Sequence, residues 1–595
     1  MARDPWALAV ALSALPLLVA TRRAPLGEPF ADDFLFLDFS VLHRRLSWWG
    51  GGGADNYWRP LARQAYYGVL GPLMLSHPAW IGALHVLALV AAGVLIQRAL
   101  RPHWPGPLSA AAGAFPLGLE SARVLIAWPA AAQDLGALFF LALAFHAFAR
   151  GRAVLLALAA VAAALCKEVA APLALLVGLA PLPPPARGAR GMRVALVAAL
   201  AAWGVARLAV QSSALHGSPS GAGTDGAGAA TLLARVAGSL GQVTLDAFSL
   251  GARARGPGAP LAIALLVGAP LAFAIAFARV RTWWRWSAWG LAWWAVGSAP
   301  LALFLPDWAP FRSVLPAVGL GITILAPFTG RPVASLLPVV GLRLATLLAA
   351  PGDAPLTTTL PPRTSAFMDF EHMAREQHFM RSMRSSLRAA YPSLPHGAVV
   401  ARANMPRGLL VAFEGNRALQ CWYRDTTLRL AAFEDVQRAP TAALVTVAQF
   451  QSRQAREVAL VRPDAALLQS KAIADFRAGR YDSCLGEFTR ADSLEPDPRA
   501  VVFHSESAGA RAYALGMLER YDAARAEALR ARAIDADNIN ARLVLVILDL
   551  GERRYDRAEA LLDSLLADAP TQTTALEMQR TLRALRNGQR SPPGP

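Results

Sequence analysis

Apolar runs long enough to cross a lipid bilayer recur through the first 350 residues, and no other feature constrains the fold as strongly. A transmembrane helix needs about 17 to 25 mostly apolar residues. The candidate spans lie at roughly 5–20, 79–97, 107–128, 134–149, 153–166, 169–182, 194–211, 259–278, 287–305, 314–328 and 332–350. The sequence therefore predicts a polytopic α-helical membrane protein with about 11 transmembrane helices over residues 1–350.

The positions of the arginines predict how this domain is oriented. The chain has 58 Lys and Arg against 41 Asp and Glu, a net charge of +17. These cations are spread through short loops and the C-terminal part rather than gathered in one stripe, which argues against a nucleic-acid partner. If the N-terminus is cytoplasmic, the loops richest in arginine fall inside, as the positive-inside rule requires. Those loops carry Arg98, Arg101, Arg150, Arg152, Arg187, Arg190, Arg193, Arg279, Arg281, Arg285 and Arg331.

Two adjacent carboxylates, Asp32 and Asp33, open a long loop that this orientation places on the outer side. Neighbouring carboxylates can raise each other's pKa or share a cation, here Mg²⁺ or Mn²⁺. One of them could then act as a general base toward an acceptor hydroxyl. They could equally do no more than start the following helix, where aspartate is favoured.

Three cations also emerge on the expected outer side. Lys167 is one of only two lysines in the chain, and Glu168 follows it within the apolar stretch AVAAALCKEVAAPLALLVGL. A charge near a bilayer is costly, so this pair is a functional candidate, although it could be a self-neutralised turn. Arg59 in NYWRPL and Arg312 in DWAPFRSVLP could bind a phosphate or simply extend to the membrane interface.

The pattern changes after about residue 363, where charge density rises. The segment MDFEHMAREQHFMRSMRSSLRAAYPSL predicts an amphipathic helix. Short strands are predicted in GAVVARANM, GLLVAFEG, ALQCWYRD, TLRLAAF, AALVTVAQF and EVALVRP. Residues 363–462 are therefore expected to form a small soluble α/β domain.

Repeated helical pairs are predicted at residues 465–585. Tyr481, Tyr521 and Tyr555 occupy equivalent places in three similar segments, and the last two are 34 residues apart, the tetratricopeptide period. We therefore expect a tetratricopeptide-repeat α-solenoid, whose concave face suits an extended protein or glycan partner.

The order of these motifs resembles the transmembrane and tetratricopeptide-repeat O-mannosyltransferases and their bacterial relatives. These enzymes belong to the GT-C superfamily, which uses lipid-phosphate sugars. The resemblance rests on DD in the first outer loop, NYWRPL, AWPAAAQDLGALFFL, ALCKEVAAPLALL and FRSVLPAVGL, followed by a repeat domain. The chain departs from the family at FPLGLESARV and AAAQDLGA, where it keeps Asp134 but lacks the Gly-Arg of the relatives. The sugar therefore cannot be carried over from the family.

The resemblance implies an inverting, hexosyl- or mannosyltransferase-like enzyme of a bacterial inner membrane. Its polyprenyl-phosphate sugar donor would lie in the lipid bilayer, with the site and C-terminal domains on the periplasmic side. Asp32 or Asp33 would be the base, and Arg59, Lys167 and Arg312 would bind the donor phosphate. Tyr57, Asp134 and Glu168 would orient the substrate. The competing interpretation is a non-catalytic membrane-anchored tetratricopeptide scaffold for protein assembly.

Overall fold

The computed structural model describes residues 4–44, 47–50, 57–182, 189–214, 229–250, 283–304, 308–329, 331–349, 370–405, 409–439, 441–451 and 457–586. Contacts group the chain into two compact units. The first comprises Met1–Arg381 and Gly408–Thr426, and the second comprises Ser382–Arg407 and Thr427–Pro595. Most of the two ranges expected at 363–462 and 465–585 falls in the second unit.

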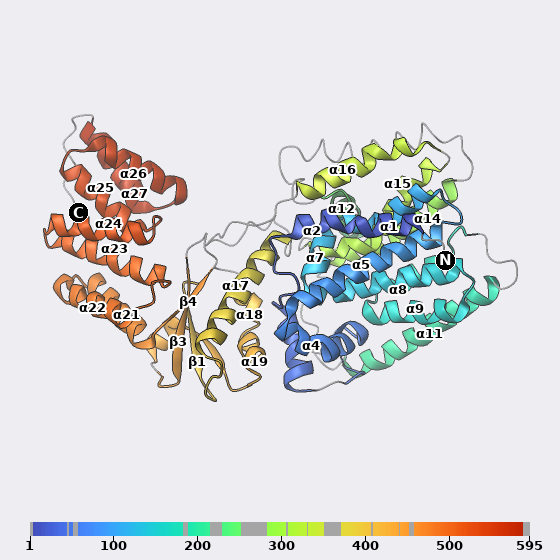
Figure 1. Ribbon diagram of the computed structural model, residues 1–595, viewed down its shortest axis with the longest axis horizontal. Coiled ribbons are helices and arrows are strands. Elements are labelled where there is room, and N and C mark those ends of the chain that lie inside the picture. The colour runs from blue at the N-terminus through green and yellow to red at the C-terminus, as the bar shows by residue number, and fades with distance from the viewer. Residues whose placement is uncertain are drawn as a thin grey trace. The chain divides into compact units, whose positions relative to one another are not determined.

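The described part of the first unit consists of helices joined by loops (Figure 1). Its helices are α1 (Pro5–Leu12), α2 (Ala14–Thr21), α3 (Asp32–Leu37), α4 (Tyr66–Ser76), α5 (Pro78–Leu100), α6 (Gly106–Ala114), α7 (Glu120–Ala127), α8 (Ala132–Ala149), α9 (Ala153–Cys166), α10 (Ala170–Val177), α11 (Ala189–Ala214), α12 (Ala229–Ala247), α14 (Trp284–Ser298), α15 (Val314–Leu325), α16 (Leu337–Leu348), α18 (Leu409–Phe413) and α19 (Arg417–Tyr423). Helix α17 (Phe370–Ala390) runs from the first unit into the second.

Four helical segments are long and apolar enough to cross a membrane: Pro78–Leu100, Pro129–Ala149, Ala189–Val210 and Pro310–Phe328. Shorter apolar helical segments occupy Pro5–Thr21, Ala153–Cys166 and Val333–Leu348.

The prediction of about 11 transmembrane helices is not supported. The run at 107–128 forms the two short helices α6 and α7, and the run at 169–182 contains the eight-residue helix α10. All eight residues of α7 are buried, so its apolar side chains cover protein rather than lipid. The run at 259–278 lies outside the described residues, as do Arg187, Arg279 and Arg281 of the expected inner loops.

Close backbone contacts hold two helix pairs of the first unit together. A Cβ atom on Gly290 of α14 would lie 2.5 Å from the carbonyl oxygen of Gly319 in α15. On α5, a Cβ atom at Gly93 would lie equally close, at 2.5 Å, to the carbonyl oxygen of Gly113 in α6. Small residues at helix crossings are typical of helix packing in membranes, because they let backbones approach closely.

The second unit begins with a four-stranded sheet in the order β2-β1-β3-β4. Its strands are β1 (Val399–Ala403), β2 (Arg429–Ala432), β3 (Leu444–Phe450) and β4 (Val458–Val461), and α20 spans Phe433–Arg438. Strand β1 is parallel to β2 and β3, while β4 is antiparallel to β3. The strands predicted in GAVVARANM, TLRLAAF, AALVTVAQF and EVALVRP are thus confirmed.

The strands predicted in GLLVAFEG and ALQCWYRD are wrong, because these segments form the helices α18 and α19. Their buried residues recur at helical spacing: Leu409, Ala412 and Phe413 in α18, then Ala418, Leu419, Cys421 and Trp422 in α19. The Trp422 ring meets Phe34 of α3 edge-on at 5.9 Å. Packing within the first unit therefore outweighs the strand propensity of these short apolar runs.

The predicted helical pairs are confirmed as stacked hairpins (Figure 1). The helices are α21 (Pro463–Arg477), α22 (Tyr481–Leu494), α23 (Val501–Met517), α24 (Tyr521–Ile534), α25 (Ile539–Gly551), α26 (Tyr555–Asp568) and α27 (Thr573–Arg586). One hydrophobic cluster joins Val447 and Val461 of the sheet to Ala491 and Phe503 of the first hairpins. The sheet therefore covers one end of the solenoid, as a capping element must.

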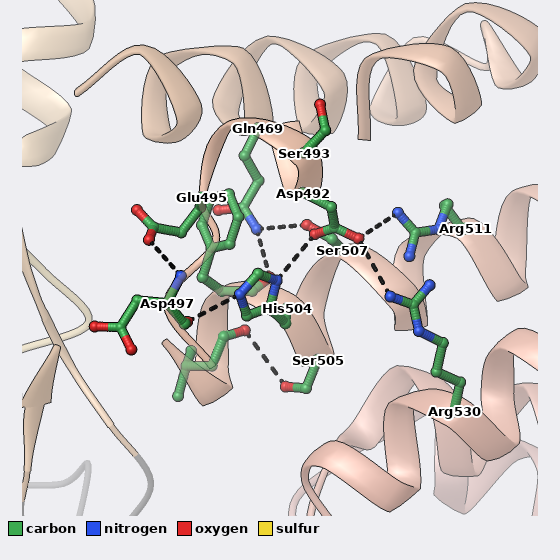
Figure 2. A network of polar contacts seen from close by, with 12 residues as sticks. Gln469, Asp492, Ser493, Glu495, Asp497, His504, Ser505, Ser507, Arg511 and Arg530 are labelled. Atoms are coloured by element: carbon green, nitrogen blue, oxygen red, sulfur yellow. Dashed lines mark hydrogen bonds and ion pairs between the residues drawn. The ribbon is translucent and has the colours of Figure 1, made fainter. Parts of the chain in front are cut away.

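A partly buried polar network joins the first hairpins to each other, and we name it the Asp492 network. Figure 2 shows Asp492 between the imidazole of His504 and the guanidinium groups of Arg511 and Arg530. Its carboxylate accepts hydrogen bonds from Arg511 Nη1 at 2.7 Å and from the His504 ring at 3.3 Å. Burial acts to raise the pKa of Asp492, but His504 and Arg511 outweigh it and lower the pKa. The carboxylate is thus held in its charged form.

Candidate functional site

The second aspartate of the predicted pair, Asp33, is sealed inside the first unit. It lies in the first turn of α3 and has no exposed surface. Its carboxyl accepts hydrogen bonds from the Tyr67 hydroxyl at 2.6 Å and the Phe30 backbone N–H at 2.9 Å. Burial raises the pKa of Asp33 to about 8, although these two hydrogen bonds act against the rise. Because Phe30 precedes α3, Asp33 does not cap that helix.

Asp32, its neighbour, is exposed to solvent. The protein packed around its carboxyl raises the pKa of Asp32, while the positive charge of Arg63 lowers it. The two carboxyls therefore differ in kind: Asp32 can meet a substrate, whereas Asp33 is fixed in the interior.

Arg59, which lies between α3 and α4, is held by Gln133 of α8 and by Glu168 in the turn between α9 and α10. Its Nε donates to Glu168 at 2.8 Å, and its two Nη atoms donate to Glu168 and to Gln133. The guanidinium carbon lies 4.3 Å from the centre of the Tyr57 ring. Burial acts to raise the pKa of Glu168, but the hydrogen bonds and charge of Arg59 outweigh it and hold that pKa at about 2. Arg207 adds a weaker ion pair to Glu168 at 3.8 Å.

Lys167 pairs with Asp134 rather than with the adjacent Glu168. Its backbone is extended where α9 ends, and its Nζ donates to Asp134 at 2.5 Å. The lysine is 8% exposed and the aspartate 2%, so both charges are removed from water. Burial lowers the pKa of Lys167, and the charge of Asp134 acts against this shift. The self-neutralised turn that the sequence allowed is therefore not formed.

Arg312 lies just before α15, beside the same lysine. Its guanidinium is 5.7 Å from the Phe311 ring, and Lys167 Nζ is 5.8 Å from that ring. The charge of Arg312 contributes to the lowered pKa of Lys167.

The structure thus brings the predicted site residues into one continuous cluster, which we name the α8-start cluster. Its predicted members are Asp32, Asp33, Tyr57, Arg59, Asp134, Lys167, Glu168 and Arg312. Two further members, Arg63 and Tyr67, were not predicted from the sequence. Arg63 stacks over Phe36 at 4.7 Å and lies 5.4 Å from the Tyr57 ring that Arg59 also contacts. Its charge is attracted by Asp32 and repelled by Arg59. The sequence could have predicted Arg63, because it follows Arg59 by one helical turn.

The acid pair does not fit the divalent cation that the sequence allowed. Both Asp33 oxygens already accept hydrogen bonds, and the cluster supplies its own positive charge through Arg59, Arg63 and Lys167. Across the described ranges there is no group of three or more His, Cys, Asp or Glu side chains that could hold a metal ion.

Comparison with known proteins leaves the family of this chain undefined. No protein-family model matches the sequence, and no curated protein matches it. Among solved structures, the chain is similar to the Arabidopsis OM64 TPR domain at 21% identity. That similarity covers 20% of this chain and 96% of the other, with a TM-score of 0.19.

Proposed function

We propose that the protein is an integral membrane glycosyltransferase that moves a sugar from a polyprenyl-phosphate donor to a hydroxyl of a protein or glycan acceptor. The carrying observation is the accessible carboxyl of Asp32 beside the buried cation Arg63, in the same cluster as the buried cations Arg59 and Lys167. Displacement of a phosphate by a hydroxyl requires a group that takes the hydroxyl proton. It also requires positive charge where the phosphate leaves.

Asp32 is the base in this proposal because it is the member of the pair that a substrate can reach. Its carboxylate takes the proton as the acceptor oxygen attacks the anomeric carbon from the side opposite to the phosphate. The bond between that carbon and the phosphate oxygen breaks, and the electron pair leaves with the polyprenyl phosphate. The raised pKa of Asp32 brings it closer to the working pH, which favours proton transfer. Asp33 positions the start of α3 through Tyr67 and Phe30.

The leaving phosphate would be held by cations that still have unused N–H donors. The Nζ of Lys167 makes one side-chain hydrogen bond, to Asp134, although an ammonium group can donate more than one. The guanidinium of Arg59 likewise has more N–H groups than its bonds to Glu168 and Gln133 occupy. Asp134, Glu168 and the Tyr57 ring fix where these cations point. Arg312 adds positive charge on the same side of Lys167.

Membrane placement follows from the long apolar helices and the distribution of arginine. With the N-terminus in the cytoplasm, the α8-start cluster faces the periplasmic side of a bacterial inner membrane. The lipid tail of the donor would then stay in the bilayer while its head group meets the cluster. The solenoid of the second unit would bind the acceptor on the same side.

Sugar transfer by the purified full-length protein in detergent tests this proposal. Polyprenyl-phosphate mannose and polyprenyl-phosphate glucose serve as labelled donors, and a periplasmic protein and glycan extract supplies acceptors. We expect Asp32→Asn to slow transfer by about 10² to 10⁴-fold, because that is the usual contribution of a general base. Asp38→Asn is the matched control, since Asp38 directly follows α3 and pairs with Arg417 at 3.4 Å.

If Asp32→Asn transfers sugar at the wild-type rate, Asp32 is not the base and the proposed mechanism is wrong. If neither donor is consumed while changes in the solenoid abolish the biological function, the protein is instead a membrane-anchored scaffold.

A further inference from the structure

A second polar site lies in the first unit, away from the α8-start cluster. It is a cavity of about 370 Å³, which we name the α8-end cavity. It is lined by Asp4, Arg98, Arg101, Pro102, His146 and Arg150. These residues come from the beginning of α1 and from the last turns of α5 and α8 or directly beyond them.

The cavity and the α8-start cluster occupy opposite ends of one helix. Asp134 lies in the first turn of α8, and His146 lies in its last turn. The helical rise of 1.5 Å per residue separates these two residues by about 18 Å along the axis. If α8 crosses the membrane, the cavity therefore opens on the face opposite to the proposed transfer site.

The arginines of this cavity differ from those of the α8-start cluster in having no anionic partner. Arg98, Arg101 and Arg150 are exposed, and their side chains form no ion pair or hydrogen bond with the described part of the chain. Asp4 is the one acidic residue in the lining. Its two carboxylate oxygens accept from the Trp6 backbone N–H at 3.1 Å and from Gln97 Nε2 at 3.2 Å. The cavity therefore carries a net positive charge and unused donors.

We propose that the α8-end cavity binds the phosphate-bearing head group of an anionic phospholipid. Guanidinium groups match phosphate oxygens in geometry and charge, and several of them around one hollow can bind a single phosphate group. The cavity lies where the long apolar helices α5 and α8 end. If these helices cross the membrane, that is the depth of the lipid head groups.

The surface next to the cavity suits the acyl chains of such a lipid. Helix α1 starts directly after Asp4, and its Leu8 and Leu12 are 60% and 52% exposed. These side chains form an apolar surface that begins beside the charged cavity. The head group would bind the arginines, and the acyl chains would lie against α1. A soluble phosphate would use only the charged part, and for this reason we assign the site to a lipid.

Thermal unfolding of the full-length protein in detergent tests the assignment. Phosphatidylglycerol is the proposed ligand, phosphatidylcholine is the lipid without net charge, and glycerol 3-phosphate is the soluble head group. We expect phosphatidylglycerol to raise Tm, and the other two to have little effect at the same concentration. Arg98→Gln/Arg150→Gln should weaken the apparent affinity for phosphatidylglycerol by about tenfold or more, since each substitution removes a charge-assisted contact.

The matched control is Arg190→Gln/Arg331→Gln, which removes the same charge from expected inner loops outside the cavity lining. An equal loss in the control would show that surface charge, not the cavity, attracts the lipid. An equal Tm shift with glycerol 3-phosphate would reassign the cavity to soluble phosphates, and no shift with phosphatidylglycerol would remove it as a site. If the double variant fails to fold, Arg101→Gln, also exposed, replaces it. Sugar transfer is not part of this readout, so either proposal can fail alone.

Discussion

Two charge clusters, one in each unit, shift the pKa of particular aspartates in opposite directions. In the α8-start cluster the pKa values of Asp32 and Asp33 are raised by the protein packed around their carboxyl groups. In the Asp492 network the pKa of the aspartate is lowered, because His504 and Arg511 outweigh burial. Both clusters contain several cations. What differs is whether the cations outweigh the surrounding protein at these aspartates.

This difference separates a cluster suited to proton transfer from one suited to holding helices together. Asp492 is neutralised by partners 12 and 19 residues away, within adjacent hairpins. Arg59 and Lys167 instead form ion pairs with Glu168 and Asp134, which are 109 and 33 residues away respectively. The acid pair of α3 is thereby left with raised pKa values beside fixed cations. Perturbed groups of this kind cluster at functional sites.

The largest effect on stability should come from breaking the buried pair of Lys167 and Asp134. Lys167→Met leaves the Asp134 carboxylate, which is 2% exposed, without its cation. We expect a loss of about 3–5 kcal/mol in the free energy of unfolding. Thermal unfolding of the full chain measures it.

The double variant Lys167→Met/Asp134→Leu should recover much of that stability, because it removes both charges, yet it should still lack transfer activity. A double variant no more stable than the single one would contradict this account of the pair. The comparison between the α8-start cluster and the Asp492 network would then lose its support from stability.

A smaller loss should follow from Asp492→Asn, which takes the charge from the centre of the Asp492 network. We expect about 1–3 kcal/mol of destabilisation, because His504 and Arg511 lose a charged acceptor. Hydrogen exchange of α22 and α23 reports it, and sugar transfer should be unchanged. Asp482→Asn, at an exposed position of the same helix, is the control. Reduced transfer per folded molecule in Asp492→Asn would break the division between the two clusters.

The most gradual effect is a difference in pH dependence between the clusters, spread over several pH units. The pKa of Asp33 rises from 3.8 to about 8 on folding, so the folded state holds a proton that the unfolded chain has released. Its stabilising contribution is complete below pH 3.8 and is lost as the pH rises toward 8, by at most about 1.4 kcal/mol per pH unit. Asp492 has a lowered pKa, so its contribution is lost only as the pH falls below 3.8.

His504 has a raised pKa, so its contribution is complete below its ordinary value of 6.5 and is lost at higher pH. Between pH 3.8 and 6.5 we therefore expect α3 to lose protection from hydrogen exchange while α22 and α23 keep theirs. Asp33→Asn should remove most of the pH dependence of hydrogen-exchange protection in α3. If protection in α3 and in α22 and α23 changed equally with pH, burial would not be what sets the pKa of Asp33.

Charged residues in apolar surroundings were the part of the cluster that sequence could identify. Lys167, Glu168 and Asp134 stand out because ionisable groups are costly near a bilayer. Tyr67 was missed because a tyrosine among interfacial aromatic residues carries no such signal. The partner of Lys167 was also beyond sequence, since the adjacent Glu168 was the simplest choice and packing instead brought Asp134 within 2.5 Å.

Sequence by itself determined the features that follow from the local spacing of residues. These are the apolar runs, the three helical pairs marked by Tyr481, Tyr521 and Tyr555, and four of the strands. Tertiary structure alone decided that the run at 107–128 is two short helices and that α18 and α19 are not strands. It also decided which aspartate is accessible, because Asp32 and Asp33 are chemically identical and only packing distinguishes them. Burial and ion pairing depend on segments far apart in the chain, and no local pattern encodes them.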